Sequence, residues 1–310
     1  MSKPKQKTIN HKKQKSIWKN WRLYVMCLPA VLFFLLFAYK PMYGILIAFK
    51  KYNMRVGIMG SEWIGLDNFK RLFSSYWFPI ILKNTLTLSL LSLILGFPLP
   101  IILALLLNEV SNGHFRKTFQ TVSYAPHFIS TVVICSMITL FMNQSSGLIN
   151  NVIAALGGKR VDFLGTAAYF PHIYVWSGVW QNLGWGTIIY LATLSAVSPE
   201  LHEAAYLDGA NRMQIILHVN IPCILPTVVI MLIMNCGTIL SVGFEKVYLL
   251  QNALNLDTSQ TISTYNYELG LLGGQYSYTT AIGLFNTVVN VVMLTIVNTV
   301  SRRVSEISLW

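Results

Sequence analysis

Charged side chains are scarce in this sequence, since Asp, Glu, Lys and Arg together make up 11% of its 310 residues. A soluble domain usually carries about 25% charged residues, so this chain has too few charges to cover the surface of a compact water-soluble protein. Intrinsic disorder is excluded for the same reason, because disordered segments are rich in charge and poor in apolar residues. With 54% hydrophobic residues, the composition indicates a protein that lies in a bilayer.

The motifs of common enzyme classes are also missing. No G-x-x-x-x-G-K-[ST] segment occurs, and the fragment Gly157-Gly158-Lys159 lacks the leading Gly and the Ser or Thr that such a nucleotide site needs. No two His residues have the H-E-x-x-H spacing, and no elbow motif marks a Ser/His/Asp site. We therefore expect no catalytic residue, no bound cofactor and no metal site in this chain. His127 and His172 lie in or beside apolar runs, where a hydrogen-bonded interior His is the expected structure.

Cysteine is rare, and the spacings of the four Cys residues match no zinc or redox motif. Cys27, Cys135 and Cys236 fall inside apolar runs, and Cys223 lies just before one. We therefore expect buried structural thiols.

Positive charge is concentrated at the N-terminus. Eight of the 23 Lys and Arg residues lie in residues 1–22, which contain no acid. Such a cluster occurs in nucleic-acid-binding tails, but directly before an apolar span it is typical of a cytoplasmic anchor under the positive-inside rule. We interpret residues 1–22 as a basic cytoplasmic tail beside membrane lipid, with no nucleic-acid partner.

Gaps between charges define six apolar segments, each near the length of about 20 residues with which a helix crosses a bilayer. They cover Leu23–Phe49, with an expected break near Lys40 and Pro41, then Thr85–Leu107, Tyr124–Phe141, Ile173–Val197, a segment that starts after Pro222 and ends before Glu245, and Thr280–Thr299. The predicted fold is an all-α membrane protein with one six-helix domain over residues 23–301 and a short cytoplasmic C-terminal tail, 302–310.

Six spans place both termini on the same side of the membrane. Thirteen Lys and Arg then lie inside and ten lie outside or near the outer ends, but without the tail the inner number falls to five. The predicted orientation, with both termini cytoplasmic, therefore depends on the N-terminus. The long outer connections 50–79, 143–172 and 244–279 are rich in aromatic residues. These are typical of a membrane interface, and their flat faces also suit stacking on sugar rings.

The middles of the second to sixth spans contain no Asp, Glu, Lys or Arg, which argues against a proton-coupled pump with buried carboxylates. They carry neutral polar residues at helical spacing instead. Interhelical hydrogen bonds explain such residues, and a lumen for an uncharged polyhydroxy substrate requires the same residue types. The candidate substrate path comprises polar residues of the fifth and sixth spans and two tyrosines of the last outer connection. These residues are Asn235, Thr238, Ser241, Asn286, Asn290, Tyr267 and Tyr276.

The loop that follows the fourth span has the signals of a short helix. Ser198 before Pro199 is typical of a helix start, and Gly209 suits a left-handed helix end. Ala204 and Ala205 permit close approach of another surface. The alternative from the residues alone is an ordinary amphipathic connector on the membrane surface.

In this loop, Glu203-Ala204-Ala205, then Gly209, then Val219-Asn220-Ile221-Pro222 resembles the EAA loop of ABC-importer permeases of the binding-protein-dependent, type I family. The family pattern ends in Ile-x-Leu-Pro, so Val219 and Ile221 are conservative departures. The segments Ser123–Val133 and Ile262–Phe285 are similar to the LplB-type branch of carbohydrate permeases. The resemblance thus extends over most of the chain.

The resemblance implies the type I ABC importer permease fold in a bacterial plasma membrane, with a coupling helix in loop 198–222 that fits a groove on a separate ATPase. The implied coupling residues are Glu203, Ala204, Ala205, Asp208 and Gly209. The implied partners are a second, non-identical permease, a dimer of ATP-binding cassette ATPases that holds ATP and Mg, and an extracytoplasmic sugar-binding lipoprotein. Oligosaccharides or polysaccharide fragments are the implied substrates, moved by alternating access that ATP hydrolysis drives.

Two other functions stay open from the residues. One is an EAA-type permease for another solute, such as an amino acid, phosphate or a metal chelate; the lack of charge in the spans disfavours ionic solutes. The other is a stand-alone secondary transporter or channel. That function needs intramembrane charges or paired half-helices, and the sequence shows no convincing pair.

Overall fold

The computed structural model describes residues 21–305 and 307–309, and most of them are helical. The predicted tail 1–22 thus lies outside the described residues except for its last two. The N-terminal third comprises α2 (Trp21–Phe34), a π turn (Leu35–Tyr39), α3 (Lys40–Met42), a 3₁₀ segment (Tyr43–Phe49), β1 (Lys50–Lys51), α4 (Gly57–Gly60), β2 (Glu62–Trp63) and α5 (Asp67–Ser74). The two strands pair antiparallel, with Lys50 opposite Trp63.

The central part is built around long helices. It comprises α6 (Trp77–Gly96), α7 (Pro98–Asn108), α8 (Gly113–Tyr124), a 3₁₀ turn (Ala125–Phe128), α9 (Thr131–Phe141), α10 (Leu148–Ala155), a 3₁₀ turn (Ala167–Tyr169) and α11 (Phe170–Ser195). The last third comprises α12 (Pro199–Leu207), α13 (Arg212–Ile215), a π turn (Ile216–Asn220), α14 (Ile221–Cys236), α15 (Phe244–Leu250), α16 (Leu256–Ser259), α17 (Ile262–Tyr267), a π turn (Glu268–Leu272) and α18 (Tyr276–Ser305).

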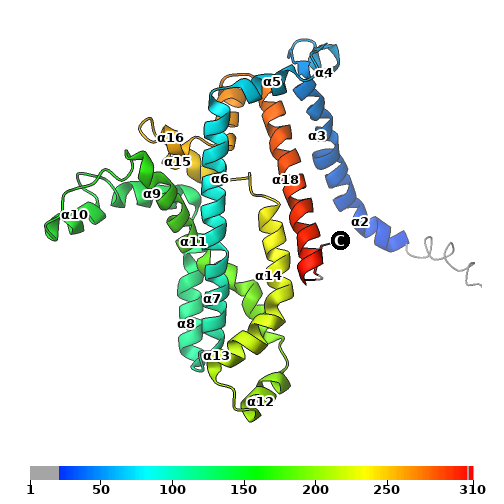
Figure 1. The fold of residues 1–310 in the computed structure, drawn as a ribbon. Helices are drawn as coiled ribbons and strands as arrows, with labels where there is room; N and C mark the ends of the chain where they lie inside the picture. Colours follow the sequence, from blue (N-terminus) through cyan, green and yellow to red (C-terminus); the bar gives the residue numbers. More distant parts are fainter. Residues whose placement is uncertain (1–20, 306, 310) are drawn as a thin grey trace, which may run out of the picture.

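These helices form an elongated bundle with two distinct ends (Figure 1). The helix α11 packs against α6, α7 and α14, and α14 packs against α18. The short helix α12 lies at one end of the molecule, and α4 and α5 lie at the other (Figure 1). The start of α2 and the end of α18 both lie away from α4 and α5 (Figure 1).

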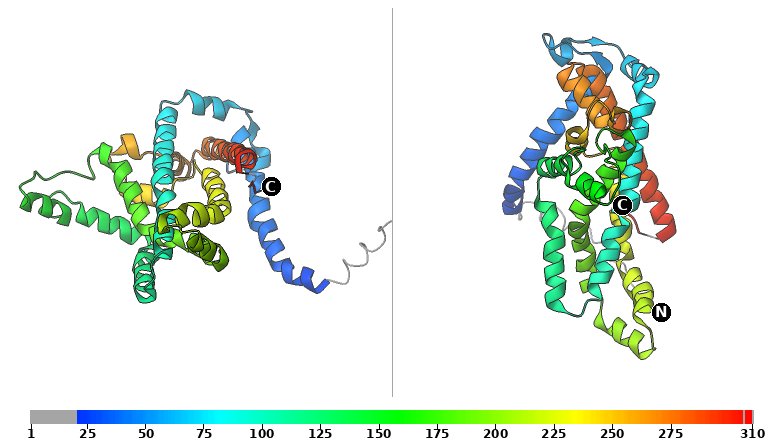
Figure 2. Two further views of the ribbon diagram at one scale, coloured as in Figure 1. Left: turned by 60° about the horizontal axis from the view of Figure 1, so that its bottom comes forward. Right: turned by 90° about the vertical axis from the view of Figure 1, so that its left-hand side faces the viewer.

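The first predicted span is confirmed, including its irregular outer part. Regular α-helix ends at Phe34, and a π turn and a 3₁₀ segment follow on either side of Pro41. Proline lacks the N–H that the turn before it needs, and a π turn absorbs such a local mismatch. Most of this span stands apart from the rest of the chain (Figure 2), and no residue in its most apolar stretch is buried. Cys27 is therefore exposed, against our prediction, whereas Cys135 and Cys236 are buried.

The predicted number of six spans is not confirmed in detail. Within the part of the chain that the structure describes, four helices are long and apolar enough to cross a membrane, namely Trp21–Phe49, Trp77–Asn108, Arg212–Cys236 and Tyr276–Ser305. The predicted third span, 124–141, is not one straight helix, because α8 with its 3₁₀ turn meets α9 at 94°; counted as one span, this pair raises the number to five. The predicted fourth span corresponds to α11, which has 26 residues but contains no 18-residue stretch as apolar as those in the four helices.

The bend between α8 and α9 has a local cause. Pro126 closes the 3₁₀ turn after α8, and Ile129 is extended. Ser130 then begins a new helix, because its side chain accepts a hydrogen bond from the Val133 N–H at 3.4 Å. An apolar run without charges therefore contains a proline turn and a helix cap, which together redirect the chain.

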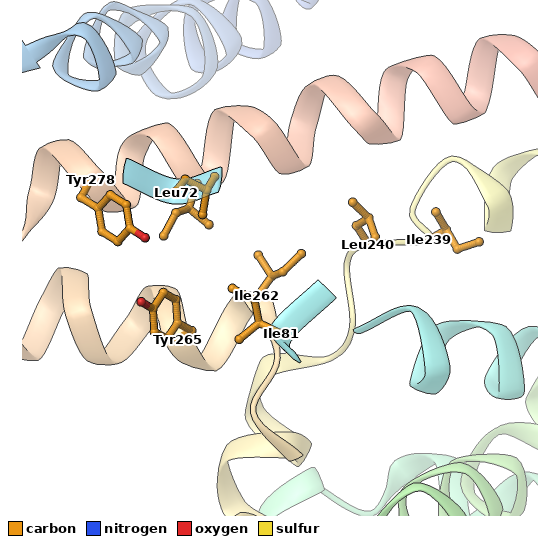
Figure 3. Packing of buried hydrophobic residues seen from close by; sticks show 8 residues of the cluster. Leu72, Ile81, Ile239, Leu240, Ile262, Tyr265 and Tyr278 are labelled. Atoms are coloured by element: carbon orange, nitrogen blue, oxygen red, sulfur yellow. The ribbon is translucent and has the colours of Figure 1, made fainter. Parts of the chain in front are cut away.

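One buried cluster ties the end of the bundle near α5 to its middle. It joins α5, α6, α17, α18 and the segment after α14 through Leu72, Ile81, Ile239, Leu240, Ile262, Tyr265, Tyr278 and Ile282. Figure 3 shows the Tyr265 and Tyr278 side chains turned toward one another between α17 and α18. Burial of one such apolar side chain contributes about 1.5–3 kcal/mol.

The segment 244–279, predicted as an outer connection, packs into the bundle as short helices. Asn84 of α6 donates hydrogen bonds to the carbonyl oxygens of Asp257 and Gln260, at 2.9 and 3.0 Å. The Ile262 N–H donates to the Thr85 hydroxyl at 3.0 Å. These two polar residues on α6 therefore hold the start of α17 against the bundle.

Gly184 permits the close contact between α11 and α8. A Cβ atom at this position would lie 2.2 Å from the carbonyl oxygen of Ser123, a distance at which the two helices must separate. Gly113, the first residue of α8, has no atom within 4 Å of its Cβ position. Gly184 on α11 is therefore tightly packed, whereas Gly113 on α8 faces open space.

We expect Gly184→Ala to lower the thermal stability of the detergent-solubilised protein, whereas Gly113→Ala leaves it nearly unchanged. Overpacking of this kind costs about 1–3 kcal/mol, and each kcal/mol corresponds to roughly 2–4 °C for a chain of this size class. The measurement is the midpoint of thermal aggregation, followed by size-exclusion chromatography. Equal midpoints for the two variants would contradict the close contact.

Candidate functional site

A cavity of about 470 Å³ lies between the rod of α6 and α7, the helices α11 and α14, and the segment that leads to α15. Its volume lies within the range of about 300–1,000 Å³ that is typical of ligand pockets. No Asp or Glu lines it, and among the described residues no three His, Cys, Asp or Glu side chains come together to hold a metal. The polar side chains that line it, apart from two Tyr, are Ser89, Ser92, Gln181, Asn182, Asn235, Thr238, Ser241 and Lys246.

Two amides on α11 are oriented by the bend between α8 and α9. Gln181 donates a hydrogen bond from Nε2 to the carbonyl oxygen of Ile129 at 3.2 Å. The Asn182 Oδ1 atom lies 3.0 Å from Nδ1 of His127, whose ring stacks on Trp185 with ring centres 4.4 Å apart. His127 is therefore hydrogen-bonded, as predicted, but it is half-buried and not interior. By contrast, His172 is exposed in this chain.

The three polar residues predicted on the fifth span all line the cavity, but not as one helix face. The helix α14 ends at Cys236, so of the three only Asn235 lies on it. Asn290 of α18 holds the non-helical segment that follows, because it accepts a hydrogen bond from the Leu240 N–H at 3.1 Å and donates one to the Ser241 hydroxyl at 3.0 Å. The cavity wall is thus an interrupted helix secured by a neighbouring one.

The other predicted path residues lie outside this cavity. Asn290 acts on the cavity through Ser241. The buried Oδ1 atom of Asn286 has no hydrogen-bond partner within the described part of the chain. Tyr267 packs against Phe244, with ring centres 4.9 Å apart. Tyr276 lies near α4, where it lines a separate surface hollow.

Sequence reasoning did not assign Ser89, Ser92, Gln181 or Asn182 to the substrate path, and it also missed the charged cavity residue, Lys246 on α15. Its side chain is 8% exposed, and its Nζ atom lies 5.2 Å from the centre of the Tyr174 ring. Burial lowers the pKa of the Lys246 ammonium to about 8, so at pH 7 the group is mainly protonated. The available signal is that Lys246 is the single Lys or Arg between Arg212 and Arg302, but the sequence places it in the predicted outer connection 244–279.

The loop around α12 has the predicted local structure. The Ser198 side chain caps the helix by accepting a hydrogen bond from the Glu200 N–H. Gly209 has a φ of +77°, and the Ala210 N–H reaches back to the carbonyl oxygen of Ala205 at 2.9 Å. This is the Schellman ending in which glycine is favoured. The predicted coupling residues Glu203, Ala204, Asp208 and Gly209 are exposed, and Ala205 is half-buried.

A side-chain hydrogen bond joins α12 to the start of the long helix that follows it. The Nε2 atom of His202 on α12 lies 2.9 Å from Oδ1 of Asn220, and Asn220 is fully buried. Asn220 belongs to the continuous helix Arg212–Cys236, which includes α14. The free end of α12 also presents Leu207, which is 90% exposed. The loop is therefore fixed on its inner side and open on its outer side.

Comparison with known proteins shows relatives over almost the whole chain. The permease protein YteP of the polygalacturonan/rhamnogalacturonan transport system of Bacillus subtilis (strain 168) is 45% identical over 284 residues, which cover 92% of this chain and 88% of the relative. Protein LplB of the same organism is 41% identical over 288 residues, which cover 93% and 91%.

Solved structures give the same result. A crystal structure of a bacterial ABC transporter involved in the import of the acidic polysaccharide alginate contains a chain that is 44% identical, with a TM-score of 0.87 and coverage of 94% of this chain and 98% of that chain. A second crystal structure shows the alginate ABC transporter in complex with an alginate pentasaccharide-bound periplasmic protein. Its matching chain is 42% identical, with a TM-score of 0.89 and coverage of 96% and 100%.

These likenesses confirm the all-α permease fold. Residues 96–306 match the family model for the inner membrane component of binding-protein-dependent transport systems. That range includes every residue of the α12 loop and most of the cavity. The chain therefore belongs to the family of binding-protein-dependent transport system inner membrane components.

Proposed function

We propose that this chain is the permease subunit of an ATP-driven importer for oligosaccharides or polysaccharide fragments. The observation that carries the proposal is the cavity between α6, α7, α11 and α14, which is lined by amides, hydroxyls and aromatic rings. Such groups suit the hydroxyls and the apolar faces of sugar rings. The relatives support the same substrate class, because they belong to transport systems for pectic polysaccharides and alginate.

The α12 loop is proposed to dock on a separate ATPase subunit on the cytoplasmic side. Its exposed outer side, with Glu203, Asp208 and the apolar Leu207, is available to a partner. His202 and Asn220 link α12 to the helix Arg212–Cys236, which is about 37 Å long at 1.5 Å per residue. The far end of that helix reaches the cavity wall at Asn235. A displacement of α12 would thus be transmitted to the cavity by one rigid element.

The mechanism that follows is alternating access. ATP binding would close an ATPase dimer and shift α12, which opens the cavity to the outside; hydrolysis would restore the inward-open form. This requires that ATP favours one of the two states over the other. A second, non-identical permease would complete the pore, and an extracytoplasmic sugar-binding lipoprotein would deliver the substrate. With the ATPase on the cytoplasmic side, both termini of this chain are cytoplasmic and the outer end carries α4 and α5.

Purification from native membranes in mild detergent tests the assembly. We expect mass spectrometry to find an ATPase with a P-loop and a second permease chain with this one. The expected ratio is two ATPase copies to one copy of each permease. A homo-oligomer that lacks an ATPase under several gentle conditions would contradict the proposal and favour the stand-alone transporter.

Substitution of Gly209 tests the coupling loop. We expect Gly209→Val to reduce sugar uptake at least fivefold with normal membrane insertion, because a β-branched residue is strained at a φ of +77°. Gly209→Asn is the matched control, since Asn tolerates the left-handed conformation, and it should retain most uptake. The measurement is the initial rate of uptake in cells, with the amount of protein determined by immunoblot. Equal uptake by both variants would show that the shape of this turn is irrelevant to transport.

Substitution of Asn235 tests the cavity. Asn235→Ala removes one hydrogen bond to a sugar hydroxyl, which contributes about 0.5–1.5 kcal/mol. We expect this loss to lower the maximal uptake rate roughly two- to tenfold. The comparison is Asn286→Ala, which removes the same amide from a residue outside this cavity. Rates are measured in proteoliposomes at a saturating concentration of binding protein. An effect at Asn286 without one at Asn235 would place the substrate path along α18 instead.

A further inference from the structure

Lys246 carries a positive charge into the wall of the cavity without a counter-ion in this chain. Its Nζ atom is buried and has no hydrogen-bond partner among the residues that the structure describes. The ion pair found in the described part of the chain joins Lys70 to Asp67 on α5, elsewhere in the molecule. A buried ammonium ion without a partner is strongly unfavourable, and in membrane proteins such a group is a functional-site signal.

The ammonium lies in the wall of the cavity, enclosed by neighbouring residues. The ring of Tyr174 covers one side, with its centre 5.2 Å from Nζ, and this contact stabilises the charge without neutralising it. Gly178 lies one turn further along α11, and because it lacks a side chain it leaves room for the ammonium. A Cβ at that position would be 3.4 Å from Nζ. All three residues line the cavity, so the buried charge lies directly behind the cavity surface.

The groups around this charge are neutral hydrogen-bonding groups. Gln181 uses its Nε2 atom on Ile129, which leaves its carbonyl oxygen for another donor. Asn235 likewise donates from Nδ2 to the carbonyl oxygen of Met231 at 2.7 Å, which leaves its own side-chain oxygen free to accept. A ligand that satisfies one cation and several neutral acceptors carries one anionic oxygen and several hydroxyls. This is the chemistry of a sugar acid.

We propose that Lys246 binds the carboxylate of a uronic-acid unit while an acidic oligosaccharide passes through the cavity, and that this contact selects acidic chains over neutral ones. The inference rests on the proposed importer function and adds the charge of the substrate and the residue that recognises it. The absence of charge in the predicted spans favoured an uncharged solute; the structure alters this, because it folds a lysine from outside those spans into the lumen.

The choice of lysine fits passage through a pore. A lysine ammonium ion contacts a carboxylate as a point charge, whereas an arginine holds both oxygens in a fixed geometry. A contact to one oxygen is released more readily than a contact to both. Passage through a pore requires such release, because the substrate must leave each site that it binds. Phosphate groups fit less well, because they favour arginine or several cations and N–H groups together. A single lysine beside neutral amides matches a monoanion.

The test is uptake by the complete importer in proteoliposomes, with this chain, its partner permease, the ATPase and the binding protein. Two labelled probes of equal length are compared: an oligogalacturonate and its fully methyl-esterified form, which keeps the hydroxyls and loses the charge. The ratio of acid to ester uptake is measured for wild type and Lys246→Gln. Since selection by the binding protein enters both ratios equally, their quotient isolates the contact between Lys246 and the carboxylate.

We expect the ratio of acid to ester uptake to be at least tenfold lower in Lys246→Gln than in wild type. In Lys246→Arg we expect this ratio to be more than half of the wild-type value. A ratio that changes less than twofold overturns the assignment of Lys246, and so does a wild type that prefers the ester. If wild type takes up neither probe and no neutral oligosaccharide, the proposed function itself is contradicted. The two failures are thereby distinguished.

Thermal stability of the purified complex provides a second measurement that does not depend on transport. Without sugar, Lys246→Met should have the same melting temperature as wild type or a higher one, because it removes an uncompensated buried charge. Added oligogalacturonate should raise the melting temperature of wild type and not that of the variant. A variant that melts several degrees lower without sugar would show that a carboxylate of a partner chain pairs with Lys246, which overturns the proposal.

Discussion

The structure depends on amide side chains that provide hydrogen-bond partners for backbone that is not helical inside the bundle. Where lipid replaces water, every backbone N–H and C=O group needs a partner within the protein. Asn84 supplies partners for the carbonyls of Asp257 and Gln260, and Asn290 supplies one for the N–H of Leu240. These contacts allow the chain to leave helical structure after Cys236 and to return as short packed helices.

The interruption of helical structure after Cys236 forms part of the cavity and links the cavity to the exposed α12 loop. The segment after α14 forms one wall, and the helix Arg212–Cys236 leads from this wall to the loop that carries α12. The contact between His202 and Asn220 fixes α12 to the base of that helix. Recognition of a substrate and contact with a partner subunit are thus placed at the two ends of one rigid element, which is the arrangement that coupling between them requires.

The electrostatics of the cavity combine many neutral groups with one buried cation. The neutral amides and hydroxyls interact with any polyhydroxy chain and give little selectivity among sugars. Lys246 differs, because its charge is enclosed and lacks a partner in the described chain, and its neighbour Gly178 leaves space beside it. Selectivity for charge would then come from a residue outside the regular membrane helices.

The sequence by itself determined the membrane class, most helix positions and the α12 loop, because these depend on local properties. Apolar length sets a span, and the pairs Ser198-Pro199 and Asp208-Gly209 set the start and the end of a helix wherever it lies. The tertiary structure alone decided the 94° bend between α8 and α9, the end of α14 before Thr238, and the place of Lys246. The bend comes from a turn within an apolar run, which hydropathy does not reveal. The other two depend on residues distant in the sequence. Asn290 lies 50 residues from Leu240, and Tyr174 and Gly178 enclose Lys246 from another helix. Hydropathy records how apolar a segment is, but not which side chains from elsewhere surround it.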